Sequence, residues 1–128
     1  MVKKLLSLFV LLTLIVGCSP SYDETGGYKE STINKDFPVP ANAEPGEANF
    51  GNPNIEKGVK YKLKNIGGEQ GLLPPQRYFQ EIEKLGWKEE KDKQMGSVHF
   101  FKKDDTVIAV EIEENSFDLY QLKEGAPY

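Results

Sequence analysis

The sequence predicts an α+β fold, a two-layer β-α-β-β-β unit in which one helix packs on one face of a mostly antiparallel sheet. Residues 59–64 alternate strictly between apolar side chains and lysine, which is typical of a half-buried strand. Residues 76–85 carry apolar side chains at helical spacing. Residues 98–101, 107–112 and 117–122 form three further short apolar segments separated by turns.

The first predicted strand places Val59, Tyr61 and Leu63 on the core face and its lysines in water. A glycine-rich segment, residues 67–71, then interrupts the chain. A glycine loop before a helix could bind phosphate through free backbone N–H groups, but the two prolines that follow remove two of these groups. Glu69 adds the wrong charge for an anion site. We therefore expect a turn here and no phosphate site.

The predicted helix has an apolar stripe formed by Tyr78, Phe79, Ile82 and Leu85. The prolines before it suit a first helical turn. Gly86 follows the stripe at the position where a left-handed C-terminal cap is common.

Residues 103–105 predict a short hairpin turn between the second and third strands. In the third strand, Ile108, Val110 and Ile112 share one face, and Glu111 lies on the other. We assign residues 58–124 to this small α+β domain.

The first 17 residues are typical of a signal peptide. Lys3 and Lys4 precede an uncharged apolar run over residues 5–16. That run holds 12 residues, whereas a helix that crosses a bilayer needs about 20. We therefore expect export across a membrane and no permanent membrane-spanning helix.

The end of this signal, Ile15-Val16-Gly17-Cys18, resembles the lipobox of bacterial lipoproteins. The resemblance implies that Cys18 receives a diacylglyceryl group and becomes the first residue of the mature protein, with palmitate or similar acyl chains. Two chains are enough for stable anchoring, whereas one is marginal. Two alternatives are an ordinary cysteine after a conventional signal and a small core cysteine. The expected location is the outer, extracytoplasmic face of the cell membrane.

Two segments separate the signal from the predicted domain. Residues 18–36 are rich in Ser, Thr, Gly and charge, with a single aliphatic residue, and predict a flexible tether. Residues 37–57 predict an extended Pro-rich arm, because each proline fixes φ and restrains the residue before it. The arm either lies along the domain through Phe37 and Val39, which we favour, or serves as a proline-rich ligand for a partner.

The lead-in Phe37-Pro38-Val39-Pro40 and the helix exit Leu85-Gly86-Trp87 look like those of many small bacterial lipoproteins of unassigned function. The resemblance covers residues 37–122, and its motifs are structural. It supports the fold class and implies no activity.

The net charge of −4 becomes −6 without the signal, which contains two of the 16 basic residues and no acidic one. This balance argues against nucleic acid as a partner, because nucleic acid rewards basic surfaces. The only cysteine is Cys18, so no disulfide can stabilise the domain. No pattern in the sequence calls for a cofactor or a metal ion.

His99 is the only histidine, and a metal site or a catalytic relay would need partners at fixed geometry. We interpret it as a packed or surface residue. Paired carboxylates such as Glu111, Glu113 and Asp118 can serve acid–base hydrolysis. Glu111 and Glu113 can instead pair across strands with Lys60, Lys62 and Lys64, which is the interpretation we favour.

Phe100 and Phe101 are adjacent and must point to opposite faces of their strand. One of them lies away from the helix, and if nothing covers it this face is a candidate partner surface. The sequence thus predicts a non-enzymatic, membrane-anchored binding or accessory module that contacts an envelope protein or cell-wall component. The alternative is a small envelope hydrolase that uses paired carboxylates.

Overall fold

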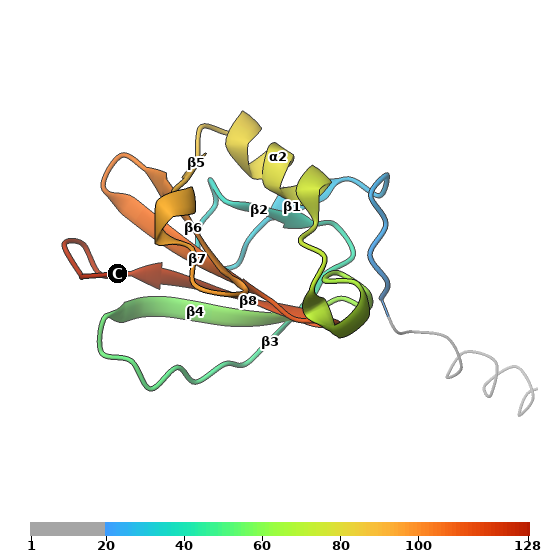
Figure 1. Ribbon diagram of the computed structural model, residues 1–128, viewed down its shortest axis with the longest axis horizontal. Coiled ribbons are helices and arrows are strands. Elements are labelled where there is room, and N and C mark those ends of the chain that lie inside the picture. The colour runs from blue at the N-terminus through green and yellow to red at the C-terminus, as the bar shows by residue number, and fades with distance from the viewer. Residues whose placement is uncertain (1–19) are drawn as a thin grey trace, which may run out of the picture.

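The computed structural model describes residues 20–128, which form two layers. One layer is a six-stranded antiparallel sheet, and the other contains helix α2 and a small two-stranded hairpin (Figure 1). Helix and hairpin lie on the same side of the sheet. The predicted α+β class and the single helix on one sheet face are therefore confirmed.

The large sheet has the strand order β3-β4-β8-β7-β6-β5. Its strands are β3 (Glu44–Gly46), β4 (Ile55–Lys62), β5 (Lys88–Glu89), β6 (Val98–Lys103), β7 (Thr106–Ile112) and β8 (Ser116–Leu122). The described part of the chain also contains two short 3-10 helices, η1 (Glu69–Gly71) and η2 (Lys91–Lys93). The four strands expected from sequence are β4, β6, β7 and β8, and the structure adds β3 and β5 at the two edges.

Helix α2 (Gln76–Lys84) buries its apolar stripe against the sheet. Tyr78, Phe79 and Ile82 are buried, as predicted. Leu85 differs from the prediction, because the helix ends before it and leaves it 45% exposed. Gly86 has φ +98°, which matches the left-handed exit expected of a glycine at this position.

The structure corrects the prediction of a flexible tether over residues 18–36. Within its described part, β1 (Tyr28–Glu30) pairs with β2 (Pro38–Pro40) to form the small hairpin. Ile33, the one aliphatic residue of the segment, is buried at 9% exposure in the main core. Because Ile33 reaches this core, the segment gains enough burial to be ordered despite its polar composition.

The arm lies along the domain, as favoured. Phe37 and Val39 have no exposed surface. The ring of Phe37 makes an edge contact with Trp87 at a centroid distance of 5.1 Å, and the Trp87 Nε1–H donates to the Asp36 carbonyl oxygen at 2.9 Å. The folded unit therefore begins well before residue 58, close to Pro20.

Candidate functional site

Strand β4 has a free edge over its first half. It pairs with β8 from Ile55 to Lys62, with an irregularity near its start, but with β3 only over Lys60–Lys62. Beyond Gly46 the chain leaves β4 and crosses the outer sheet face, where Phe50 lies 5.3 Å from the ring of Tyr120. Residues 55–59 therefore have no strand partner on the β3 side among the described residues.

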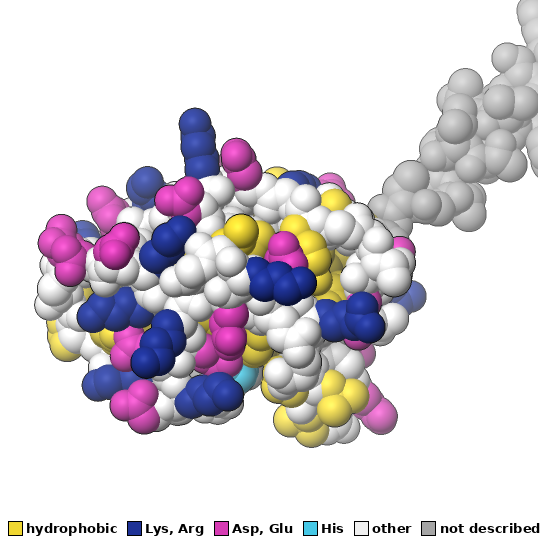
Figure 2. Space-filling model, turned by 90° about the horizontal axis from the view of Figure 1, so that it is seen from above, with side chains coloured by type: hydrophobic (Ala, Val, Ile, Leu, Met, Phe, Trp, Pro, Cys, Tyr) yellow, Lys and Arg dark blue, Asp and Glu magenta, His cyan; other side chains and the backbone are white. Residues whose placement is uncertain are grey.

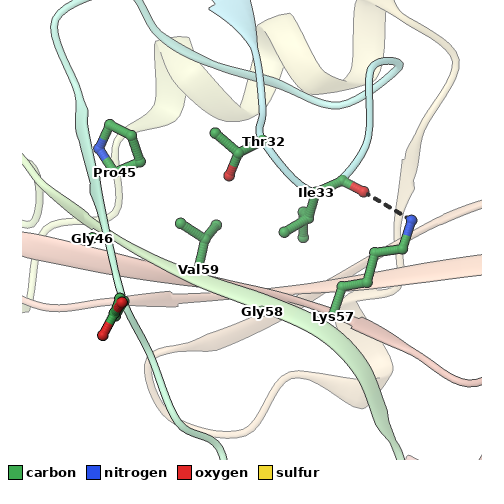
Figure 3. A pocket seen from close by; sticks show the side chains of 8 residues that line it. Thr32, Ile33, Pro45, Gly46, Lys57, Gly58 and Val59 are labelled. Carbon is green, nitrogen blue, oxygen red and sulfur yellow. Dashed lines mark hydrogen bonds between the residues drawn. The ribbon is translucent and has the colours of Figure 1, made fainter.

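An open groove runs along this edge, with a volume of about 580 Å³. Its wall comes from the loop between β1 and β2 on one side and from the end of β3 on the other (Figure 3). It is lined by Thr32, Ile33, Pro45, Gly46, Glu47, Lys57, Gly58 and Val59. Figure 3 shows the side chains of Ile33 and Val59 directed into the space between these elements.

The groove continues past Lys57. The Nζ of Lys57 donates to the Ile33 carbonyl oxygen at 3.5 Å, and a second hollow of about 490 Å³ shares Thr32, Ile33 and Lys57 with the first. Asn34 and Gln121 line this second hollow, where their side-chain amides hydrogen bond at 3.2 Å. The two hollows together give an elongated surface depression.

The backbone of Gly58 faces this depression. In an antiparallel sheet, successive residues direct their N–H and C=O groups alternately to the two neighbouring strands. The Leu63 N–H donates to the Asn115 carbonyl oxygen on the β8 side at 3.1 Å. By alternation, Lys60 and Gly58 direct their backbone groups to the β3 side. At Lys60 these groups meet Gly46 of β3, whereas at Gly58 β3 has already ended.

The lining favours binding over catalysis. One amine, Lys57, and one carboxylate, Glu47, stand among small, apolar and hydroxyl side chains. An unpaired strand edge can accept a further strand, which supplies the missing hydrogen bonds and places alternate side chains in the neighbouring hollows. The groove is therefore a candidate site for an extended peptide segment.

Cys18, the expected lipid attachment residue, and Ile15, Val16 and Gly17 of the lipobox-like sequence lie outside the described residues. Among residues 20–128, no helix is long and apolar enough to cross a membrane.

The structure corrects the candidate partner surface at Phe100 and Phe101. They do point to opposite faces, but Phe101 is fully buried under the helix layer and Phe100 is only 4% exposed. The C-terminal segment covers Phe100, with the Tyr128 ring at 5.1 Å. Tyr128 is held there by a hydrogen bond from its hydroxyl to the Glu90 carboxylate. Burial and this carboxylate raise the pKa of Tyr128 to about 12.

His99 is buried at the edge of the sheet. It is therefore a packed residue, which is one of the two interpretations given for it. Its Nδ1 lies 3.2 Å from an oxygen of Glu89, and its ring lies 4.7 Å from that of Phe79. Figure 2 shows the imidazole as a small surface beside acidic side chains. Within the described part of the chain, no three His, Cys, Asp or Glu side chains are grouped to hold a metal ion.

Of the two predicted carboxylate–lysine pairings, that of Glu113 is present, whereas among the described residues Glu111 forms no ion pair with a lysine. Lys60 Nζ lies 3.6 Å from Glu113 and 3.7 Å from Asp118. Asp118 lies opposite Glu111 in register. Burial raises the pKa of both Glu111 and Asp118. The neighbouring carboxylates Asp118 and Glu113 add to the rise in pKa at Glu111, whereas at Asp118 the nearby Lys60 opposes it. The grooves described above are lined by other residues.

The glycine loop is a packing element. A Cβ on Gly67 would lie 2.2 Å from the Glu113 carbonyl oxygen, so only glycine fits without a backbone shift. The Gln70 N–H donates to the carboxylate of Glu114 at 2.9 Å. Most backbone donors of the loop therefore already bind protein oxygens.

The sequence interpretation missed the groove residues Thr32 and Ile33, because both fall in the predicted tether. The lone aliphatic residue in a polar stretch was the signal that could have found them. Comparisons with protein families, curated proteins and solved structures find no match to this chain.

Proposed function

We propose that this protein is a lipid-anchored, extracytoplasmic and non-enzymatic module that binds an extended polypeptide segment of an envelope protein along the free edge of β4. The observation that carries the binding role is the groove at Lys57–Val59, where a sheet edge, an apolar wall and free backbone groups coincide. The anchoring role depends on the lipobox-like sequence that ends at Cys18.

The expected ligand is a short strand antiparallel to β4, in line with β3. Residues 56–59 form four positions of open edge, because the Ile55 N–H already donates to the Asn52 carbonyl oxygen, and they span about 13 Å at roughly 3.3 Å per residue. This length suits four or so peptide residues. An aliphatic ligand side chain would contact Ile33 and Val59, and an acidic one would lie near Lys57.

A peptide selection tests the binding role. A soluble version covering residues 20–128 is used to select from a phage-displayed library of random linear peptides, and the selected peptide is titrated into isotope-labelled protein. The amide signals of residues 57–59 should shift most, and the Gly58 amide should become protected from hydrogen exchange. Shifts centred elsewhere, or no selected peptide, would contradict the proposal.

Two tryptophan substitutions provide a matched comparison. Thr32→Trp fills the groove from its wall, whereas Glu44→Trp changes an exposed residue where β3 is already paired with β4. We expect Thr32→Trp to weaken peptide binding by about tenfold or more, which corresponds to about 1.4 kcal/mol. Glu44→Trp should leave the affinity unchanged within about twofold, or about 0.4 kcal/mol.

The anchoring role is tested by labelling cells with radioactive palmitate. The protein should take up the label, and Cys18→Ala should lose it. A wild-type protein without label would contradict the anchor. The binding role would still be tested separately by the peptide titration.

One observation favours a second candidate, a small envelope hydrolase. Glu111 and Asp118 face each other across two strands, and both have raised pKa values, a feature of carboxylate pairs that exchange protons in catalysis. A panel of chromogenic glycosides tests it. Hydrolysis that is lost in Glu111→Gln and in Asp118→Asn would favour the hydrolase over the binding module.

A further inference from the structure

Two leucines are strongly exposed on the loop before α2. Leu72 is 72% exposed and Leu73 is 65% exposed, and they are adjacent in sequence. Figure 1 places this loop at the end of the molecule where the described chain begins, and Figure 2 shows hydrophobic side chains gathered on a lobe at this end. A pair of adjacent exposed leucines costs solubility unless something apolar covers it.

The loop holds these leucines in a fixed arrangement. The Leu73 N–H donates to the Gly67 carbonyl oxygen at 2.8 Å, and the Leu72 N–H donates to that of Glu69 at 3.3 Å. The Gly67 N–H in turn donates to the Glu114 carbonyl oxygen at 3.3 Å, next to β8. The leucines are therefore displayed by a hydrogen-bonded loop that is joined to the sheet.

The start of the described chain is tied to the same region. The Lys64 N–H donates to the Pro20 carbonyl oxygen, and the Tyr22 N–H donates to the Lys64 carbonyl oxygen, both at 2.8 Å. Lys64 is three residues from Gly67, so these two points are at most about 11 Å apart. Cys18 is two residues from Pro20, which allows at most about 7 Å between them.

A lipid on Cys18 would therefore hold the domain directly on the bilayer surface, with this end toward the membrane. We propose that Leu72 and Leu73 insert into the outer leaflet of the membrane in which the lipid of Cys18 is embedded. This inference rests on the proposed lipid anchor. The loop then acts as a second membrane contact that fixes the orientation of the domain.

The contact is apolar in character. Lys64 is exposed near the loop, but Glu69 within the loop is also exposed, and Arg77 pairs with Glu24 at 3.3 Å. These charges give little net attraction for anionic headgroups. Insertion should therefore be equal in vesicles of phosphatidylcholine alone and in vesicles that also contain phosphatidylglycerol.

Site-directed spin labelling of the lipidated full-length protein tests the proposal. Because Cys18 is the only cysteine and its sulfur would carry the lipid, an added cysteine is the one free thiol. Leu73→Cys labels the loop, and Asp104→Cys labels the turn between β6 and β7, at the opposite end in Figure 1. Mass spectrometry first verifies the lipid on Cys18, and each protein is then reconstituted into the two kinds of vesicle.

The label at 73 should be accessible to oxygen and shielded from an aqueous nickel chelate, and the label at 104 should show the reverse. Adding Leu72→Ser should move the label at 73 toward water, whereas Leu85→Ser, which changes an exposed leucine at the far end of α2, should not. A lipidated protein whose label at 73 is fully accessible to the nickel chelate would overturn the insertion alone. A protein without lipid would overturn the anchor itself.

Discussion

Replacing Phe37 with alanine tests whether the N-terminal arm belongs to the core. Phe37 has no exposed surface, and its ring contacts those of Trp87 and Phe101 at centroid distances of 5.1 and 6.0 Å. Removing a fully buried phenylalanine ring costs about 3–5 kcal/mol, because the transfer free energy is lost and a cavity remains. That is a large share of the roughly 5–15 kcal/mol by which a domain of this kind is stable.

Urea unfolding followed by tryptophan fluorescence measures this loss, since Trp87 is the only tryptophan and contacts the substituted ring. The melting temperature should also fall by about 10 °C or more, given about 4–8 °C per kcal/mol for a small domain. Leu72→Ala is the matched control at an exposed position and should change stability by less than about 0.5 kcal/mol. A Phe37→Ala protein as stable as this control would refute the packing of the arm.

Three further predictions follow from single positions. Gly67→Ala should destabilise the folded protein by about 1–3 kcal/mol through overpacking. Gly51→Ala should leave the stability unchanged, because no atom lies within 4 Å of the added Cβ. Urea unfolding measures both variants. Burial raises the pKa of Asp118 above 3.8, so the folded state binds this proton more tightly than the unfolded state does. The free energy of unfolding should therefore fall as pH rises from the pKa of Asp118 in the unfolded state to its higher pKa in the folded state. Asp118→Asn should reduce that fall in a pH series of unfolding curves. Tyr128→Ala should uncover Phe100 and increase the fluorescence of a bound hydrophobic dye.

Each of these has a result that would count against it. Equal stability of the two glycine variants would mean that the backbone near Glu113 adjusts freely. If the free energy of unfolding depends on pH in the same way in Asp118→Asn and in the wild type, the pKa of Asp118 is not raised in the folded state. Unchanged dye fluorescence would show that the C-terminal segment does not protect Phe100.

The strongly periodic parts of the sequence predicted the structure well. The alternation from Val59 to Leu63 specified a strand and its buried face, since a period of two allows only one set of side chains to face the core. The stripe of α2 was equally informative up to Ile82. Leu85 was misassigned because the helix ends one residue earlier, and a stripe cannot show where the last turn unwinds.

The N-terminal segment could not be predicted in this way. Its polar composition indicates disorder when residues 18–36 are considered alone, and only tertiary contacts of Ile33 and of the β1–β2 hairpin reverse that. The coverage of Phe100 is a similar case. Alternation shows that one of two neighbouring aromatics faces away from the helix, but not that Tyr128 returns to cover it.

The groove is the least predictable feature. It exists because β3 ends at Gly46 while β4 continues to pair with β8, so it depends on the relative lengths of two strands that are distant in space from the predicted helix. Neither Thr32 nor Lys57 carries a local signal of this arrangement. Binding sites that depend on an unmatched strand edge are therefore found only from the assembled sheet.

The intact mass of the protein extracted from cell membranes shows whether the chain is processed and lipidated at Cys18. We predict a chain that begins at Cys18, with the first 17 residues removed and a diacylglyceryl group on the cysteine sulfur. A protein that retains those residues, or that begins elsewhere and carries no lipid, would contradict it.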